Sequence, residues 1–201
     1  MFGRCLIASA QLNCSMEMLI VVAMVSCDMT VFLTPREKRE EALSVQRQFL
    51  SVQGDHCTLL NVYSAWNSVA AKKRRRWADD NFINNRALLK AHDIKEQLEK
   101  HLIECKLPIT SCGDNRETLR KGLVGGLFPH AAKLQADGTY RVLATGQQVS
   151  LHPSSVLHGK RHNCIIFNEL VRTTKQYVRC VTVIEPGWLV ELAPVFFSRK
   201  Q

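Results

Sequence analysis

Eight cysteines and seven histidines are the residues of this sequence best suited to metal or nucleophilic chemistry. No two cysteines are spaced as Cys-x-x-Cys, which argues against a zinc ribbon or a thiol redox motif. His56 has no partner at a metal-ligand spacing, so we predict no metal site. Several cysteines occupy apolar positions of periodic stretches, where cysteine acts as a small hydrophobic residue. We therefore expect an intracellular, reducing compartment rather than a disulfide framework.

The motifs that support catalysis by a single chain are missing from this sequence. It contains no Gly-x-x-x-x-Gly-Lys-Ser/Thr phosphate loop, no Gly-x-Ser-x-Gly elbow and no His-Glu-x-x-His pair. A Gly-x-Gly-x-x-Gly dinucleotide fingerprint is also missing. We therefore predict no catalytic residues and no cofactor bound by this chain.

Polar residues at two expected strand ends are candidates for contacts with phosphate. Lys175, with Thr173 and Thr174, falls in an expected turn, where an ammonium group and hydroxyls can meet phosphate oxygens. An ordinary solvated turn is the alternative. Ser154 and Ser155 follow another expected strand and could donate to phosphate, or could cap backbone groups of a turn.

A third candidate group lies at the start of the longest expected helix. Asn81, Asn84 and Arg86 combine a helix N-terminus with a guanidinium group, which suits a phosphate. Helix capping by the asparagines and a surface ion pair of Arg86 are the alternatives. Asp55 is expected to cap the helix that begins beside it. The basic run at 72–76 is expected to be a solvated loop, a nuclear localisation patch or a nonspecific RNA contact.

Composition predicts a folded, basic protein of one large or two small domains. The chain has 201 residues, of which 46% are hydrophobic and 22% charged, so it can build a core. Lys and Arg number 27 against 18 Asp and Glu, giving a net charge of +9 that admits a polyanionic partner such as nucleic acid. The apolar run at 18–25 is too short to cross a bilayer, so we expect no membrane segment.

Hydrophobic spacing predicts helices in the first two thirds of the chain and strands after about Leu127. Apolar residues recur every three or four positions in the expected helices, which cover about 16–27, 36–49, 55–66, 85–105 and 114–125. The stretch from 67 to 80 is expected to be an exposed loop. Strands are expected over 140–144, 148–152, 164–171 and 176–183. A small basic β-barrel after a helical domain fits an oligonucleotide-binding (OB) fold.

Five segments resemble the C-terminal region of DEAH-box RNA helicases, in the family's order and at about its spacing. They read GDHCTLLNVY (54–63), WADDNFINNRALLKA (77–91), HPSS (152–155), NELVRTTK (168–175) and WLVELAP (188–194). The resemblance covers nearly the whole chain, roughly residues 13–195.

The resemblance implies an α+β fold, in which a helical ratchet-like bundle precedes a small five-stranded OB-fold barrel. It implies a remnant of the connection from a winged helix at 1–14, a ratchet-like helicase-associated domain at 15–125, an OB fold at 126–195 and a tail at 196–201. The RecA-like motor domains, which would bind ATP and Mg²⁺, have no counterpart in this sequence. The chain is accordingly expected to be a gene-model fragment, a truncated isoform or a degenerate relative.

The function implied is the C-terminal RNA-binding portion of an ATP-dependent RNA helicase of pre-mRNA splicing or ribosome biogenesis. The chain would form one wall of a channel for single-stranded RNA, with no ATPase activity by itself. Implied partners are RNA, RecA motor domains in cis or in trans, and a glycine-rich helicase activator or spliceosomal proteins, in the nucleus or nucleolus. The alternative is a protein-interaction adaptor, or activator-docking fragment, without RNA binding of its own.

Overall fold

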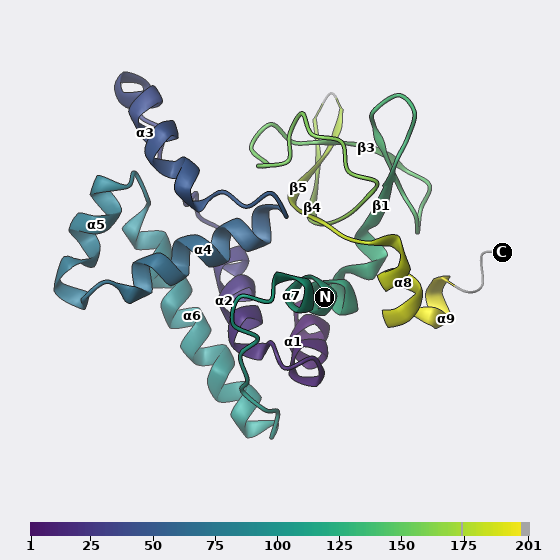
Figure 1. The fold of residues 1–201 in the computed structure, drawn as a ribbon, viewed down its shortest axis with the longest axis horizontal. Helices are drawn as coiled ribbons and strands as arrows, with labels where there is room; N and C mark the ends of the chain where they lie inside the picture. The colour runs from purple at the N-terminus through teal and green to yellow at the C-terminus, as the bar shows by residue number, and fades with distance from the viewer. Residues whose placement is uncertain (174, 198–201) are drawn as a thin grey trace.

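The computed structural model describes residues 1–173 and 175–197, which form a helical part and a small β-barrel (Figure 1). The helical part contains α1 (Phe2–Gln11), α2 (Ser15–Ser26), α3 (Arg39–Gln46), α4 (Asp55–Ser68), α5 (Arg74–Asp80), α6 (Asn85–Glu104) and α7 (Arg116–Leu127). Single 3₁₀ turns η1 (Arg36–Lys38), η2 (Arg47–Phe49), η3 (Ala71–Lys73) and η4 (Phe128–His130) lie between them. The predicted α+β architecture is confirmed.

Helix α6 shows how the sequence specifies these helices. Asn84 is its N-cap, and the side-chain oxygen of Asn84 accepts hydrogen bonds from the backbone N–H groups of Arg86 and Ala87. Leu88 and Ala91 lie on the buried face, which packs against α2. Capping and a three-to-four apolar spacing therefore place this helix where the sequence predicts it.

The predicted loop at 67–80 is wrong, because most of that segment is helical. Residues 71–73 form η3 and residues 74–80 form α5. Ala78 is fully buried in a core cluster with Trp66 and Ile83. The burial of the apolar face of α5 therefore contributes more to the stability of the helix than the repulsion between neighbouring cations costs. Water and salt screen this repulsion on the exposed face.

Residues 2–11, expected to belong to a connection at 1–14, instead form α1 and pack against α7. Cys5 and Leu6 are buried in the same cluster as Leu123 of α7. The two helices approach so closely that a Cβ atom added at Gly126 would lie 2.2 Å from Cys5 Sγ. Glycine at this position permits the contact, which joins α1 to the helical part.

The predicted five-stranded barrel is confirmed and is closed in the order β1-β2-β3-β5-β4. Its strands are β1 (Ala131–Leu134), β2 (Tyr140–Val142), β3 (Gln148–Leu151), β4 (Cys164–Arg172) and β5 (Gln176–Val183). Strands β3 and β5 pair in parallel, and the other pairs are antiparallel. Strand β1 had no clear signal in the sequence, because Ala-Ala-Lys-Leu has little β propensity and pairing on both sides holds it.

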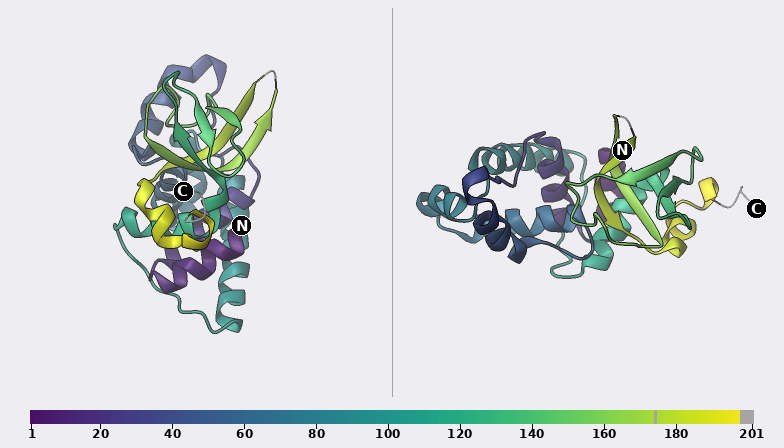
Figure 2. Two further views of the ribbon diagram at one scale, coloured as in Figure 1. Left: turned by 90° about the vertical axis from the view of Figure 1, so that its right-hand side faces the viewer. Right: turned by 90° about the horizontal axis from the view of Figure 1, so that it is seen from above.

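Two short helices follow the barrel and return to the helical part. Helix α8 (Pro186–Leu192) contacts both α7 and α9 (Pro194–Phe197). Figure 2 shows the helical part and the barrel side by side, with the β4–β5 hairpin projecting from the barrel. One core cluster contains residues of both parts, including Leu119, Leu123, Ile166 and Ile184, so the two parts share a core. Another cluster, with Tyr140, fills the barrel.

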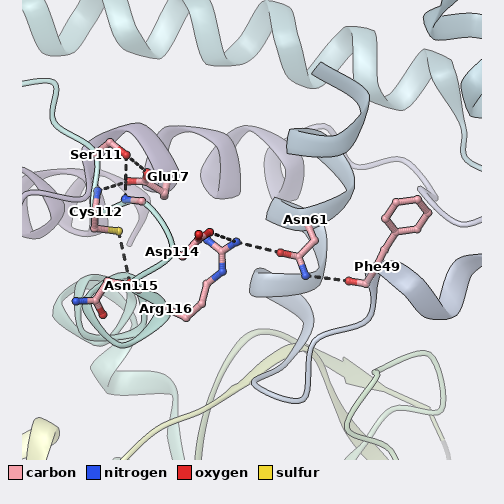
Figure 3. Close-up of polar contacts among 9 residues, drawn as sticks. Glu17, Phe49, Asn61, Ser111, Cys112, Asp114, Asn115 and Arg116 are labelled. Carbon is pink, nitrogen blue, oxygen red and sulfur yellow. Dashed lines mark hydrogen bonds and ion pairs between the residues drawn. The ribbon is translucent and has the colours of Figure 1, made fainter. Parts of the chain in front are cut away.

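A series of hydrogen bonds fixes the segment between α6 and α7 (Figure 3). The buried carboxylate of Glu17 on α2 accepts from Ser111 Oγ and from the backbone N–H of Cys112, the latter at 3.1 Å. The guanidinium of Arg116 donates to Asn61 Oδ1 on α4 at 3.2 Å. These contacts hold the start of α7 and the segment before it against α2 and α4.

Within the part of the chain that the structure describes, no helix is both long and apolar enough to cross a membrane.

Candidate nucleic-acid interface

An open groove with a cavity volume of about 800 Å³ separates part of the helical region from the barrel. One wall is formed by the end of α2, the segment that follows it and α3; the other is formed by the turn after β3 and by β4 and β5. Both predicted domains therefore contribute to the groove. Its lining includes the apolar residues Met29, Phe32, Leu43 and Leu50, surfaces on which bases and riboses can pack.

Exposed guanidinium groups line both walls of the groove. Arg36 and Arg39 come from the helical wall, and Arg179 comes from β5 of the barrel wall. Asp28, Asp55 and Glu169 also line the groove, and Glu169 lies opposite Arg179 in the register of β4 and β5. The groove thus combines cations with apolar surface and hydroxyls, the combination that suits single-stranded nucleic acid.

His152 positions the polar groups of the barrel wall. Its Nε2 atom lies 3.0 Å from the guanidinium of Arg179, and its Nδ1 atom lies 2.7 Å from Ser154 Oγ. Burial, followed by the charges of Arg179 and His158, lowers the pKa of His152, which keeps its ring neutral at pH 7. The backbone N–H of Ser154 also donates to Nδ1, at 3.1 Å, so Nδ1 acts as an acceptor and the Ser154 hydroxyl beside it can donate to it.

The structure brings together only some of the residues predicted to contact RNA. Ser154 and Ser155 both line the groove. Asn84 borders it, because its side-chain NH₂ donates to the carbonyl of Thr30, which lines the groove. All three residues have hydrogen-bond partners within the protein, but the side chain of Ser154 stays exposed.

Ser155 is buried, and its hydroxyl donates to a carboxylate oxygen of Asp55 at 2.7 Å. A hydroxyl has one hydrogen, so Ser155 is committed to that contact and is not free to donate to phosphate. Asn84 is likewise committed to capping α6. Ser155 and Asn84 thus make the structural hydrogen bonds that the sequence analysis gave as the alternative to a contact with phosphate.

The other candidates that the structure describes lie outside the groove lining. Asn81 donates to the carbonyl of Trp77 and accepts from Gln48 Nε2. Arg86 is exposed in the first turn of α6. Lys175 and Thr173 are exposed in the turn between β4 and β5, where the Thr173 hydroxyl donates to the Lys175 carbonyl. Thr174 lies outside the described residues. The role of these residues in RNA binding stays a prediction.

Sequence reasoning missed the role of Asp55, which joins the two parts. Asp55 was expected to be an N-cap, but Gly54 holds that position and Asp55 is the first residue of α4. The carboxylate of Asp55 accepts from the backbone N–H groups of Val156 at 2.8 Å and Val181 at 2.7 Å, besides Ser155. Burial raises the pKa of Asp55 despite these hydrogen bonds, which favour the ionised form.

Gly54 and His56 complete this contact, which we call the Gly54–His56 joint. Gly54 has φ of +126° and forms an isolated β-bridge with Thr182. His56 is fully buried, and its Nδ1 lies 2.8 Å from Thr182 Oγ1, while its Nε2 has no hydrogen-bond partner. The only signal in the sequence was the GDH at the start of a family segment. A capping role would have explained it equally well.

We predict a loss of stability in acid that originates at His56. Burial lowers the pKa of His56 from 6.5 to about 4, so the unfolded chain binds a proton at this residue before the folded chain does. Stability from the neutral ring is complete above pH 6.5 and is lost as pH falls from 6.5 to 4, by about 3 kcal/mol in total. Urea unfolding at a series of pH values measures this loss.

The matched variant is His56→Gln, whose amide can hydrogen-bond to Thr182 but does not titrate. The raised pKa of Asp55 acts in the opposite direction, since protonation of Asp55 favours the folded chain, and it is present in both proteins. The difference between the two pH curves therefore isolates His56. Parallel curves for the two proteins would contradict the prediction.

Two family models match this chain. The model described as "Helicase associated domain (HA2), ratchet-like" matches residues 1–59. The model described as "Oligonucleotide/oligosaccharide-binding (OB)-fold" matches residues 119–196, which include α8 and most of α9. The first match begins at α1, in agreement with the packing of α1 in the helical part.

Full-length relatives match over nearly the whole chain. The pre-mRNA-splicing factor ATP-dependent RNA helicase DEAH10 of Arabidopsis thaliana is 39% identical over 212 residues, covering 100% of this chain and 29% of the relative. Splicing factor prp22 of Schizosaccharomyces pombe is 37% identical over 98% of this chain and 17% of its own length. ATP-dependent RNA helicase DHX33 of Mus musculus is 35% identical over 99% and 28%. The chain thus spans less than a third of each of these relatives.

Proposed function

Because this chain belongs to the C-terminal, helicase-associated and OB-fold region of the DEAH-box ATP-dependent RNA helicases, we propose that it binds single-stranded RNA in the groove between its helical part and its barrel. The observation that carries the proposal is the groove itself. Both parts line it, guanidinium groups lie on both walls, and the exposed side chain of Ser154 also lines it.

The proposed binding does not read sequence. Arg36, Arg39 and Arg179 contact phosphates, Ser154 donates to a phosphate oxygen, and the apolar residues of the lining pack against bases or riboses. The Gly54–His56 joint fixes the distance between the two walls, because it bonds the first turn of α4 to the strand that carries Arg179. The wall of an RNA channel is the role that this arrangement supports.

In this proposal the chemistry of ATP belongs to motor domains supplied in cis or in trans. The sequence has no phosphate loop, so we propose that ATP and Mg²⁺ bind to those domains and not to this chain. Two of the relatives are named as splicing factors. We accordingly propose a nuclear role in RNA processing, with spliceosomal proteins or a glycine-rich activator as further partners.

The groove is tested by removing its three cations together. In the groove variant Arg36→Ala/Arg39→Ala/Arg179→Ala, we expect the affinity for a labelled oligouridylate of about eight nucleotides to fall at least tenfold. The plot of log affinity against log salt should become shallower by about 2, since each lost phosphate contact on a single strand removes about 0.7. Fluorescence anisotropy at several salt concentrations measures both quantities.

A control variant loses the same charge at residues that do not line the groove. Lys90, Lys100 and Lys106 are exposed on α6 and directly after it, and alanine at all three should leave the affinity within about twofold. Equal losses in the groove and control variants would reject the groove as the binding site. A wild-type chain that binds a partner protein, yet shows no salt-dependent RNA affinity, would favour the adaptor alternative.

A further inference from the structure

We propose that the cationic face of η3 and α5 is a second RNA-binding surface, which holds the phosphate backbone of RNA extending beyond the groove. This surface, the α5 patch, consists of Lys72, Lys73 and Arg75, all of them exposed. The proposal rests on the proposed function only in taking RNA as the ligand. Figures 1 and 2 show α5 at the end of the helical part that is farthest from the barrel.

Arg74 fixes the orientation of the patch. Its guanidinium lies 4.3 Å from the centre of the Trp66 ring and donates to the carbonyls of Val69 and Asn67 at 3.1 and 3.0 Å. It also donates to Asn67 Oδ1 at 2.9 Å. Arg74, the middle cation of the run, is thereby turned inward onto α4. The cation–π contact and the two carbonyl acceptors compensate for the loss of hydration of its guanidinium.

The other cations of the run are exposed. Lys72 and Lys73 belong to η3, and Arg75 and Arg76 belong to the first turn of α5. Arg76 is paired with Asp80 at 3.7 Å, whereas no ion pair involves the three residues of the patch among the described residues. The fold thus exposes three cations within four consecutive residues, none of them in an ion pair among the described residues.

The chemistry of this surface favours a phosphate backbone over a protein. Protein interfaces depend on buried apolar or aromatic anchors. Between residues 53 and 88, all of which the structure describes, no large hydrophobic residue is exposed. Trp77 is half-buried with its ring 5.7 Å from that of Phe49, which removes it as an anchor. Three cations without an apolar centre match a repeating line of phosphates.

The folded conformation also argues against an extended import signal. An extended peptide would require η3 and α5 to unfold, which would expose Ala78 and break the contacts of Arg74 with Trp66 and Asn67. The contacts of Ala78 and Arg74 therefore keep residues 72–76 in a folded, surface-exposed conformation rather than in an extended peptide.

The test compares short and long RNA on the full chain. The patch variant is Lys72→Ala/Lys73→Ala/Arg75→Ala, in which alanine preserves the helix and Arg74 stays in place. We expect its affinity for an oligouridylate of about eight nucleotides to stay within twofold of the wild type, because RNA of this length is held in the groove. Its affinity for an oligouridylate of about 25 nucleotides should fall at least tenfold, and the salt dependence should become shallower by about 2.

The groove variant and the Lys90/Lys100/Lys106 control carry the same loss of three charges, so long-range electrostatics affects all three proteins alike. Equal losses of long-RNA affinity in the patch and control variants would overturn the proposal. So would displacement of long RNA from the wild type by a poly-glutamate peptide at the same charge concentration, since an acidic protein would then fit equally well. If the groove variant keeps its short-RNA affinity while the patch variant loses long RNA, the proposed groove fails and the patch stands.

Discussion

Replacing Gly54 with alanine is expected to lower the free energy of unfolding by about 4 kcal/mol. With φ of +126°, Gly54 has a backbone conformation that residues with a side chain adopt only at a cost of about 1 to 3 kcal/mol. A Cβ atom there would lie 2.3 Å from the carbonyl oxygen of Val181 and 2.7 Å from the Cα of Thr182. Both contacts are with backbone, so the clash can be relieved only by moving α4 away from β5, which adds a comparable cost.

Urea-induced unfolding followed by tryptophan fluorescence measures this loss. Gly187→Ala is the matched control, because Gly187 lies in α8, has no positive φ and would place its Cβ atom in open space. Alanine in a helix is favoured over glycine, so the control should be unchanged or more stable by up to about 1 kcal/mol. A Gly54→Ala protein as stable as this control would show that the close approach of α4 to β5 is not needed for folding.

Replacing Asp55 with alanine should cost about 3 kcal/mol of stability. The change leaves the backbone N–H groups of Val156 and Val181 without an acceptor, and frees the hydroxyl of Ser155 inside the contact. Each buried donor left unsatisfied costs about 1 to 3 kcal/mol, and relief of the desolvated carboxylate recovers part of the sum. The comparison is again by urea unfolding, with the exposed Asp93→Ala as a control that should stay within about 0.5 kcal/mol.

Asp55→Asn should give an intermediate loss of stability, because one oxygen remains as an acceptor while the NH₂ group opposes a backbone donor.

Under conditions where Asp55→Ala is still folded, we expect this variant to bind short RNA more weakly than the wild type. The joint sets the spacing of the groove walls, and none of its atoms belongs to the three cations proposed to bind phosphate. Unchanged short-RNA affinity in a folded Asp55→Ala protein would show that the Gly54–His56 joint does not control RNA binding in the groove.

The sequence specified the elements more reliably than their mutual arrangement. Helix α6 was predictable because its cap at Asn84 and its apolar spacing are local, and the longer strands were predictable from alternating residues. The failures are also physical. Strand β1 depends on two neighbouring strands, and α5 depends on the burial of Ala78 against Trp66.

The candidate site was predictable only in part. Ser154 was chosen from its position after a strand, and it does line the groove. Nothing local indicated that Arg36 and Arg39 would line the same groove as Arg179, because the two segments are about 140 residues apart in the sequence. Ser155 illustrates the opposite case. Its hydroxyl could donate to a phosphate, but in the fold it donates a hydrogen bond to the carboxylate of Asp55, 100 residues away in the sequence.

The sequence by itself determined the family, the order of most helices and of the longer strands, and the absence of a phosphate loop, since each of these is recorded in residues close together in the chain. Only the tertiary structure decided that Gly54, Asp55 and His56 join two domains, that a groove lies beside this joint, and which polar side chains are free to meet a ligand. The physical reason is that the contacts of Asp55 with Val181 and of His56 with Thr182 each span 126 residues. Periodicity and turn chemistry are properties of neighbours along the chain and carry no record of such a partner.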